Sequence, residues 1–126
     1  MSGFRVDRLE AIIGMRLYAI ANNENTLICY DIQNDQLLWD LPLQDKIQAC
    51  FKINGVVNGK LRDVLVAHSH RRLHFVDLYA ASVSKRLVYP YIDHVYMCGK
   101  YLLGYDVRDK TILLRGDQPY VANPIV

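Results

Sequence analysis

Apolar residues in this sequence occur in short runs, and each run is bounded by Asn, Asp or Gly. Thr26 to Tyr30 is one such run, and it lies between the polar segments Asn22–Asn25 and Asn34–Asp35. Nowhere do the apolar residues keep the 3.6-residue period of an amphipathic helix. Short apolar runs between turn-forming residues are typical of β-strands. The pattern therefore predicts an all-β protein built of short strands and tight turns.

The predicted strands group into three successive units, residues 9–43, 47–89 and 91–117, within a single domain that covers residues 1–126. The first two units contain four strands each and the third contains three, with turn-forming residues between them. Residues 118–126 hold two prolines and are predicted to be an edge strand or a tail. The predicted strands are Glu10–Gly14, Arg16–Ala21, Thr26–Ile32, Gln36–Leu43, Ile47–Ile53, Arg62–Ser69, Arg72–Tyr79, Ser82–Tyr89, Asp93–Cys98, Tyr101–Val107 and Lys110–Arg115.

The units resemble one another in sequence. Residues 17–41 align with residues 63–87 without a gap, which places Asp31 on Asp77 and Leu27 on Leu73. A second alignment places residues 14–29 on residues 99–114, and in it the third unit has no Asp after its third strand. Repeats of about 40–45 residues are typical of four-stranded propeller blades.

The segment NTLICYDIQNDQLLWDLPL resembles the repeats of propellers of the pyrroloquinoline-quinone enzyme type. Tyr30-Asp31 provides the apolar-Asp pair that ends a strand, Asn34-Asp35 provides the turn, and Trp39 provides the Trp of the next strand. WD40 blades are similar, because they also end strands in an aromatic-Asp pair. The second unit has Lys85 in place of the Trp. In this resemblance Asp31, Asp77 and Trp39 have structural roles.

The resemblance implies about three four-stranded antiparallel blades of an incomplete β-propeller. Propellers typically need at least four blades. We therefore expect a protein partner that completes or covers the open array, and a hetero-complex is favoured over a homo-oligomer because the three units differ. The segment Gly3–Arg8 is a candidate outer strand for the last unit. Together with Gln118–Val126 it is the expected contact segment.

Composition limits the class of protein further. More than half of the 126 residues are apolar, and the formal net charge of +2 is too small to imply a polyanionic partner. No apolar run approaches the length of a membrane helix, and the charged N-terminus does not resemble a signal peptide. Cys29, Cys50 and Cys98 are predicted to be buried free thiols. These features favour an intracellular protein, cytoplasmic or nuclear, without membrane attachment.

The densest polar cluster contains His68, His70 and His74, with Arg71 and Arg72 among them. Its spacing matches no zinc motif, so no metal is expected. We predict that the cluster is an exposed hairpin tip. Within it, His70, Arg71 and Arg72 are the candidate binding residues, because arginine can bind a carboxylate or a phosphate through two parallel hydrogen bonds.

The other polar residues do not form a catalytic motif. The aspartates occur at strand ends and turns, where a carboxylate accepts backbone hydrogen bonds. No nucleophile elbow or phosphate-binding loop is present, and no cofactor is expected. The sequence therefore predicts a non-catalytic protein–protein interaction or scaffold module within a larger complex. Two alternatives stay open: a piece of a quinone-dependent dehydrogenase propeller, and a nucleic-acid-binding module that uses the His70–Arg72 tip.

Overall fold

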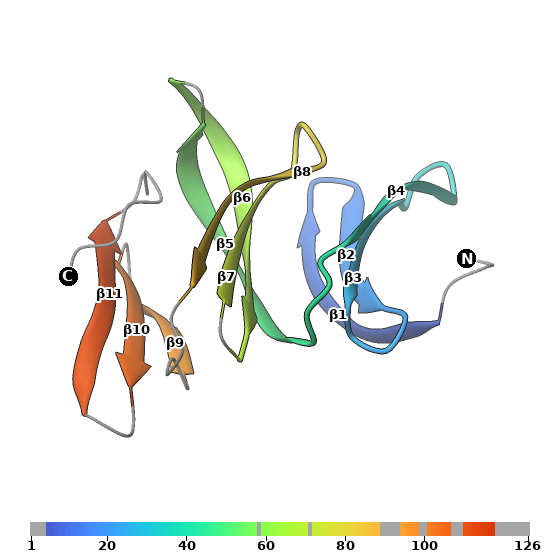
Figure 1. Cartoon of the computed structure of the whole chain (residues 1–126). Helices are drawn as coiled ribbons and strands as arrows, with labels where there is room; N and C mark the ends of the chain where they lie inside the picture. The colour runs from blue at the N-terminus through green and yellow to red at the C-terminus, as the bar shows by residue number, and fades with distance from the viewer. Residues whose placement is uncertain are drawn as a thin grey trace. The chain divides into compact units, whose positions relative to one another are not determined.

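The computed structural model describes residues 5–57, 59–70, 72–88, 94–98, 101–106 and 110–117. Within these ranges the chain forms β-strands and turns and contains no helix, as the hydrophobic pattern predicts. The strands form three antiparallel sheets (Figure 1).

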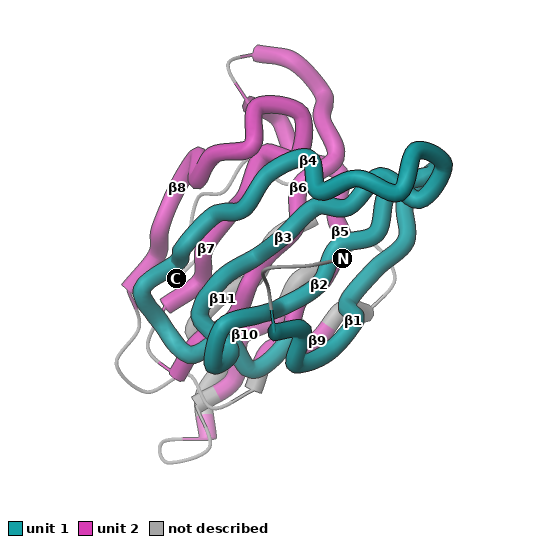
Figure 2. Tube along the Cα trace, turned by 90° about the vertical axis from the view of Figure 1, so that its right-hand side faces the viewer, with its two compact units in different colours: residues 1–49 teal, residues 50–126 magenta. Residues whose placement is uncertain are grey.

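The first sheet has the strand order β1-β2-β3-β4, with β1 Val6–Ile13, β2 Arg16–Ala21, β3 Thr26–Asp31 and β4 Gln36–Pro42. The second has the order β5-β6-β7-β8, with β5 Ile47–Val57, β6 Lys60–Ser69, β7 Arg72–Asp77 and β8 Ser82–Val88. The third has three described strands in the order β11-β10-β9, with β9 His94–Cys98, β10 Tyr101–Asp106 and β11 Thr111–Asp117. The chain divides into two compact units, residues 1–49 and 50–126 (Figure 2).

Each sheet ends in the same kind of hairpin, which we call the closing hairpin: β3–β4, β7–β8 and β10–β11. In all three, an aspartate ends the first strand and pairs in register with the residue five positions later, which begins the second strand. These aspartates are Asp31, Asp77 and Asp106. The last turn residue has a left-handed backbone in all three cases: Asp35 (φ 53°), Ala81 (φ 54°) and Lys110 (φ 56°).

A β-bulge also recurs at the same place in the closing hairpins. The register shifts between Cys29 and Tyr30, between Phe75 and Val76, and between Gly104 and Tyr105. In the second sheet, the hydroxyl of the bulged residue Ser84 donates a hydrogen bond of 3.0 Å to the carbonyl of Phe75. Turn and bulge together fix which face of the sheet each side chain occupies, because a slip of one residue would exchange the faces.

The closing hairpins correct the sequence alignment of the third unit. They equate Asp106 with Asp31 and β10 with β3. The third unit therefore does carry this aspartate, at the end of β10. The residues to compare are Leu27–Asp31 (LICYD), Leu73–Asp77 (LHFVD) and Leu102–Asp106 (LLGYD). The alignment of residues 14–29 with residues 99–114 is wrong, because it matches β3 with β11 and not with β10.

The alignment of the first two units needs a gap. Val64 of β6 pairs with Asp77, as Arg16 of β2 pairs with Asp31, so these strands are offset by 48 residues while β3 and β7 are offset by 46. The difference arises in the connection between these strands. Four residues (22–25) separate β2 from β3, and two (70–71) separate β6 from β7. The four-residue turn has left-handed backbone at Asn22, Asn23 and Glu24.

The N-terminal segment belongs to the first sheet. We expected Gly3–Arg8 to be an outer strand of the last unit and Glu10–Gly14 to be a separate strand. Instead, Val6–Ile13 is one strand that pairs antiparallel with β2, and its register shifts twice. Residues 3 and 4 lie outside the described residues.

A side-chain network attaches β1 to the rest of the first unit. The guanidinium of Arg8 donates hydrogen bonds to Glu10 (2.6 Å), to Glu24 (3.0 Å) and to the carbonyl of Ile47. The backbone N–H of Glu24 donates to the carboxylate of Asp7 (2.9 Å). The network thereby joins β1 to the β2–β3 turn and to the start of β5.

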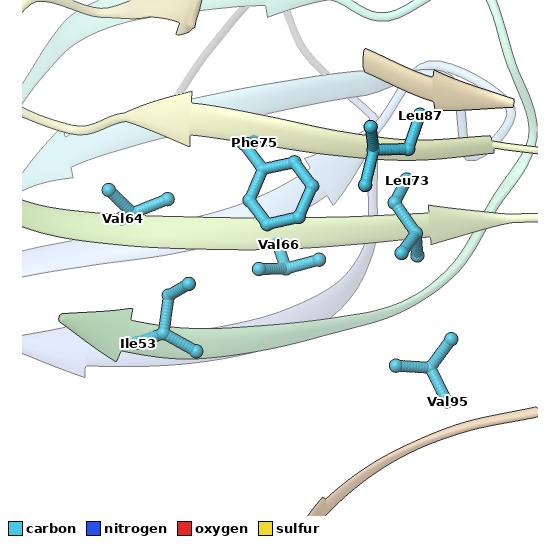
Figure 3. Close-up of a cluster of buried hydrophobic side chains, with 7 residues drawn as sticks. All are labelled: Ile53, Val64, Val66, Leu73, Phe75, Leu87 and Val95. Atoms are coloured by element: carbon cyan, nitrogen blue, oxygen red, sulfur yellow. The ribbon is translucent and has the colours of Figure 1, made fainter. Parts of the chain in front are cut away.

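The inner strands of the first two sheets are buried on both faces over most of their length, which explains their continuous apolar sequence. In β6 every residue from Val64 to Ser69 is buried, and in β7 every residue from Leu73 to Asp77. The main cluster of unit 2 combines side chains of the second sheet with Val95 of β9 (Figure 3). Its members are Ile53, Val64, Val66, Leu73, Phe75, Leu87 and Val95. Unit 1 has a smaller cluster of Ala19, Ala21 and Ile28, against which Val6 and Leu37 pack.

Trp39 is partly buried, whereas Phe75 is fully buried, and the Trp39 ring lies 6.0 Å from that of Tyr18 in the same sheet. Trp39→Ala is therefore predicted to lower the free energy of unfolding by less than Phe75→Ala. The latter truncates a fully buried side chain and is expected to cost about 3–5 kcal/mol. Urea unfolding of the two variants tests the order, and an equal or larger loss for Trp39→Ala would contradict it.

Candidate functional site

The β6–β7 turn carries the cluster of histidines and arginines predicted from the sequence. The turn is closed by Ser69, whose hydroxyl accepts a hydrogen bond from the N–H of Arg72 (3.2 Å) and donates one to its carbonyl (3.3 Å). His70 and Arg72 are exposed on this turn, and Arg71 lies outside the described residues. Two of the three candidate binding residues are thus described, and both are exposed.

The other two histidines are not part of an exposed tip. His68 and His74 are both buried. His68 is paired in register with Leu73, and His74 with Ala67, so the two rings belong to opposite faces of the sheet. Nδ1 of His74 accepts a hydrogen bond of 3.0 Å from Nε of Arg86. Burial on opposite faces prevents His68 and His74 from acting together on one ligand.

The aspartates that end β3 and β7 close the turns that follow them. Oδ1 of Asp31 accepts hydrogen bonds from the backbone N–H groups of Gln33 (3.0 Å) and Asn34 (3.2 Å), and Oδ2 accepts one from the Asn34 side chain (2.8 Å). Asp77 accepts a hydrogen bond from the N–H of Tyr79 (3.0 Å) in the same way. The hydrogen bonds from Asn34 hold the pKa of the Asp31 carboxyl below its ordinary value.

The second turn adds a cation to this arrangement. Nε of Arg62 lies 3.8 Å from Oδ2 of Asp77, and its guanidinium lies 4.2 Å from the centre of the Tyr79 ring. Asp77 is buried, whereas Tyr79 is 80% exposed. The sequence analysis identified Asp77 but missed Arg62 and Tyr79, because Arg62 lies fifteen positions before Asp77 and only the strand pairing brings them together.

Tyr18 and Cys29 are paired in register across β2 and β3 and are both buried. Burial, followed by the neighbouring Cys29 thiol, raises the pKa of Tyr18 to about 12. Burial also raises the pKa of the Cys29 thiol. Both groups are therefore neutral in the folded protein at neutral pH, and a reactive thiolate is disfavoured at Cys29. Neither Cys29 nor Cys50 forms a disulfide, and Cys50 is only half-buried. The Cys98 side chain lies outside the described side chains.

Large apolar side chains are also exposed, and the sequence analysis missed them. Leu9 and Ile12 are each 65% exposed on β1, and Met15 is 53% exposed in the following turn. Leu9 pairs with Ala19 and Ile12 with Leu17, and the register shift after Leu9 places both side chains on one face. We call Leu9, Ile12 and Met15 the β1 patch.

Within the described residues, no three His, Cys, Asp or Glu side chains gather as metal ligands would. The same part of the chain contains no helix with the length and hydropathy that a membrane span requires. Comparison of the sequence with protein-family models and with curated proteins finds no match.

Asp77→Ala should be more destabilising than Asp31→Ala. The first substitution leaves a turn N–H and the Arg62 guanidinium without their buried acceptor, which costs about 1–3 kcal/mol. The second removes a carboxylate from exposed hydrogen bonds, where water can replace it. Chemical denaturation of both variants measures the loss in the free energy of unfolding. Equal losses would show that the burial of Asp77 adds nothing to stability.

Tyr18 should make stability fall at high pH. Its folded pKa of about 12 lies above the ordinary value of 10.0, so its contribution to stability is complete below pH 10 and is lost as the pH rises toward 12. Tyr18→Phe removes this ionisation and should flatten the stability curve between pH 10 and 12. Tyr79→Phe, which makes the same substitution at an exposed position, is measured beside it for comparison. A slope that Tyr18→Phe does not change would contradict the assignment.

Proposed function

We propose that this chain is a non-catalytic protein–protein interaction module that acts as a subunit of a larger intracellular assembly. The β1 patch carries the proposal. Leu9 and Ile12 expose 65% of their surface on a paired strand of a sheet, so water contacts two large apolar groups at fixed positions. An exposed apolar group with a charged surround is characteristic of a surface that a protein partner covers.

The charges around the β1 patch fit this proposal. Asp7, Arg8 and Glu10 lie between the apolar residues of β1 in the sequence and are engaged in the hydrogen-bond network of the first unit. This network holds β1, and with it the β1 patch, in place. A partner with an apolar side chain opposite Leu9 and Ile12 could therefore dock on a preformed surface, without ordering it first.

At the level of fold, the proposal is that each sheet is blade-like, as the resemblance to propeller repeats implies. The recurring closing hairpin and the two-sided burial of β7 support it. One relation favours a face-to-face packing of the second and third sheets instead. Val66 and Val95 hold equivalent register positions, opposite Phe75 and Gly104, and both lie in the main cluster. In a propeller, one face of a blade packs against the opposite face of the next blade, so equivalent residues of two successive blades would not share one cluster.

The mass of the particle that this chain forms in its native cells tests the proposed function. We expect a mass well above the 14.5 kDa of one chain, with a second protein present. The double variant Leu9→Gln/Ile12→Gln should weaken the association at least about tenfold, and its stability should change by no more than about 0.5 kcal/mol.

Leu61→Gln is the matched control, because Leu61 is 66% exposed but belongs to β6 and not to the β1 patch. This variant should keep the full particle mass. A folded wild-type chain that sediments as a single chain in native extract would contradict the proposed function.

A further inference from the structure

The positive charges of this chain are concentrated in the second sheet. Residues 50–88, which include most of that sheet, contain seven Lys or Arg and two Asp or Glu, whereas residues 5–49 contain four Lys or Arg and seven Asp or Glu. The two carboxylates of the second sheet, Asp63 and Asp77, each form an ion pair with a neighbouring Lys or Arg. The sheet therefore carries an excess of positive charge, which attracts negatively charged ligands.

One of these cations, Arg86, is held in its orientation by a buried histidine. Nε of Arg86 donates a hydrogen bond of 3.0 Å to Nδ1 of His74, which is opposite it in register. His74 is 0% exposed, whereas Arg86 is exposed. The bond uses the innermost nitrogen of the guanidinium and leaves its two terminal nitrogens as a fork. Such a fork matches the two oxygens of a carboxylate.

The start of β7 places a second arginine on the same face. Register places Arg72 opposite Val88. This pair lies two positions from the pair of His74 and Arg86 on each strand. Side chains alternate between the faces of a strand, so Arg72, Val88 and Arg86 share one face.

These three residues are also accessible to a ligand. Arg72 and Arg86 are exposed, and Val88 is 64% exposed. Diagonal neighbours in an antiparallel pair, such as Arg72 and Arg86, lie about 7–8 Å apart, which long side chains can span. We call Arg72, Arg86 and Val88 the β7–β8 site.

We propose that the β7–β8 site binds an acidic segment of a partner protein, in which an apolar side chain lies between carboxylates. The carboxylates bind the guanidinium groups of Arg86 and Arg72, and the apolar side chain covers Val88. Because His74 already orients Arg86, little side-chain entropy is lost on binding. The inference rests on the proposed function, since it gives the chemistry by which the interaction module recognises its partner.

The surroundings of the site favour a protein segment over a nucleic acid. Val88 needs an apolar group, which a phosphate backbone does not provide. Proteins that bind single-stranded nucleic acids stack the bases on aromatic side chains. Among the described residues 50–88, Tyr79 is the one exposed aromatic side chain. It follows Asp77 at the end of β7, whereas Arg72 begins that strand.

A second copy of this chain contains a comparable acidic segment in its β3–β4 turn. Ile32 is 40% exposed there, and Asp31 and Asp35 lie on either side of it in the sequence. The Asp31 carboxylate already accepts three hydrogen bonds within its own turn, which makes it a weaker ligand for an arginine. A second copy is therefore the competing occupant that the experiment must separate from a partner protein.

The probe is a synthetic peptide with one Leu between two pairs of Glu and with uncharged caps, added to the complete chain. We expect saturable binding, with changes in the NMR signals of the backbone amides of residues 72–74 and 86–88. A peptide with Ser in place of Leu should bind at least about threefold more weakly, because Val88 then loses its apolar contact.

Arg86→Gln is the decisive variant. It removes the charge and the terminal fork, but it keeps an N–H donor on the same side-chain carbon, so the bond to His74 is retained and the chain should fold. Peptide binding should weaken at least about tenfold. Lys60→Gln is the matched control, because it removes the same charge from an exposed residue at the other end of the sheet. This variant should change the affinity less than about twofold.

His74 is a positioning residue for Arg86, and two further variants test this role. His74→Asn keeps an acceptor near the position of Nδ1 and should retain peptide binding, whereas His74→Leu removes it and should weaken binding. The NMR signal of the Arg86 Nε–H reports the bond directly and should move in His74→Leu and in no comparable way in His74→Asn. If His74→Leu does not fold, Arg86→Gln and Lys60→Gln decide the question.

Several results would overturn the proposal. These are an absence of peptide binding, and equal losses of affinity through Arg86→Gln and Lys60→Gln. Tighter binding of an oligothymidylate of equal charge, with a steep dependence on salt, would identify a nucleic-acid surface instead. Self-association of the chain that Arg86→Gln abolishes would identify a second copy as the occupant.

The native particle separates this proposal from the proposed function. If Leu9→Gln/Ile12→Gln releases the partner and Arg86→Gln does not, the proposed function stands and the β7–β8 site is rejected. Release of the partner by Arg86→Gln, but not by Lys60→Gln, supports both. A wild-type chain that is a monomer in native extract contradicts the proposed function, whatever the peptide does.

Discussion

The aspartate that closes the turn after the third strand determines the geometry of the first two sheets. Asp31 and Asp77 each accept a hydrogen bond from the backbone N–H two residues later, and Asp106 holds the same register position in the third sheet. A left-handed residue and a β-bulge follow at fixed distances in all three hairpins. Because a slip of one residue would exchange the faces of a strand, this local device decides which side chains enter the core.

Burial on both faces follows from that register. The second hairpin aligns Leu73 and Phe75 with Leu87, Val66 and Val64 on one face, and β9 adds Val95 to them. The opposite face of β7 carries His74 and Val76, which are also buried. Polar groups on a strand with two dry faces are generally hydrogen-bonded, as His74 is to Arg86. The charged side chains of the inner strands β2, β3, β6 and β7 accordingly lie toward the strand ends.

The sequence was sufficient for the all-β class, for most strand positions and for the equivalence of Asp31 with Asp77, because these depend on local patterns. It misaligned the third unit. The short motif that ends in Asp106 has Gly104 where the other units have the apolar residues Cys29 and Phe75, so its resemblance to them is weaker. A gap-free comparison also could not detect that the β2–β3 turn is two residues longer than the β6–β7 turn. Arg62, Tyr79 and the β1 patch were missed because exposure and pairing between distant strands determine them. His68 and His74 were grouped with an exposed tip because histidine alone does not indicate burial.

The strand order of the second sheet makes this register testable. β6 lies between β5 and β7, and β7 lies between β6 and β8, so the backbone of both strands is paired on both sides. Hydrogen exchange of the isolated chain, measured amide by amide, tests this arrangement most directly. The account predicts that consecutive amides of β6 and β7 are all protected from exchange. Rapid exchange at alternate amides of β7 would contradict it, because one side of that strand would then be unpaired.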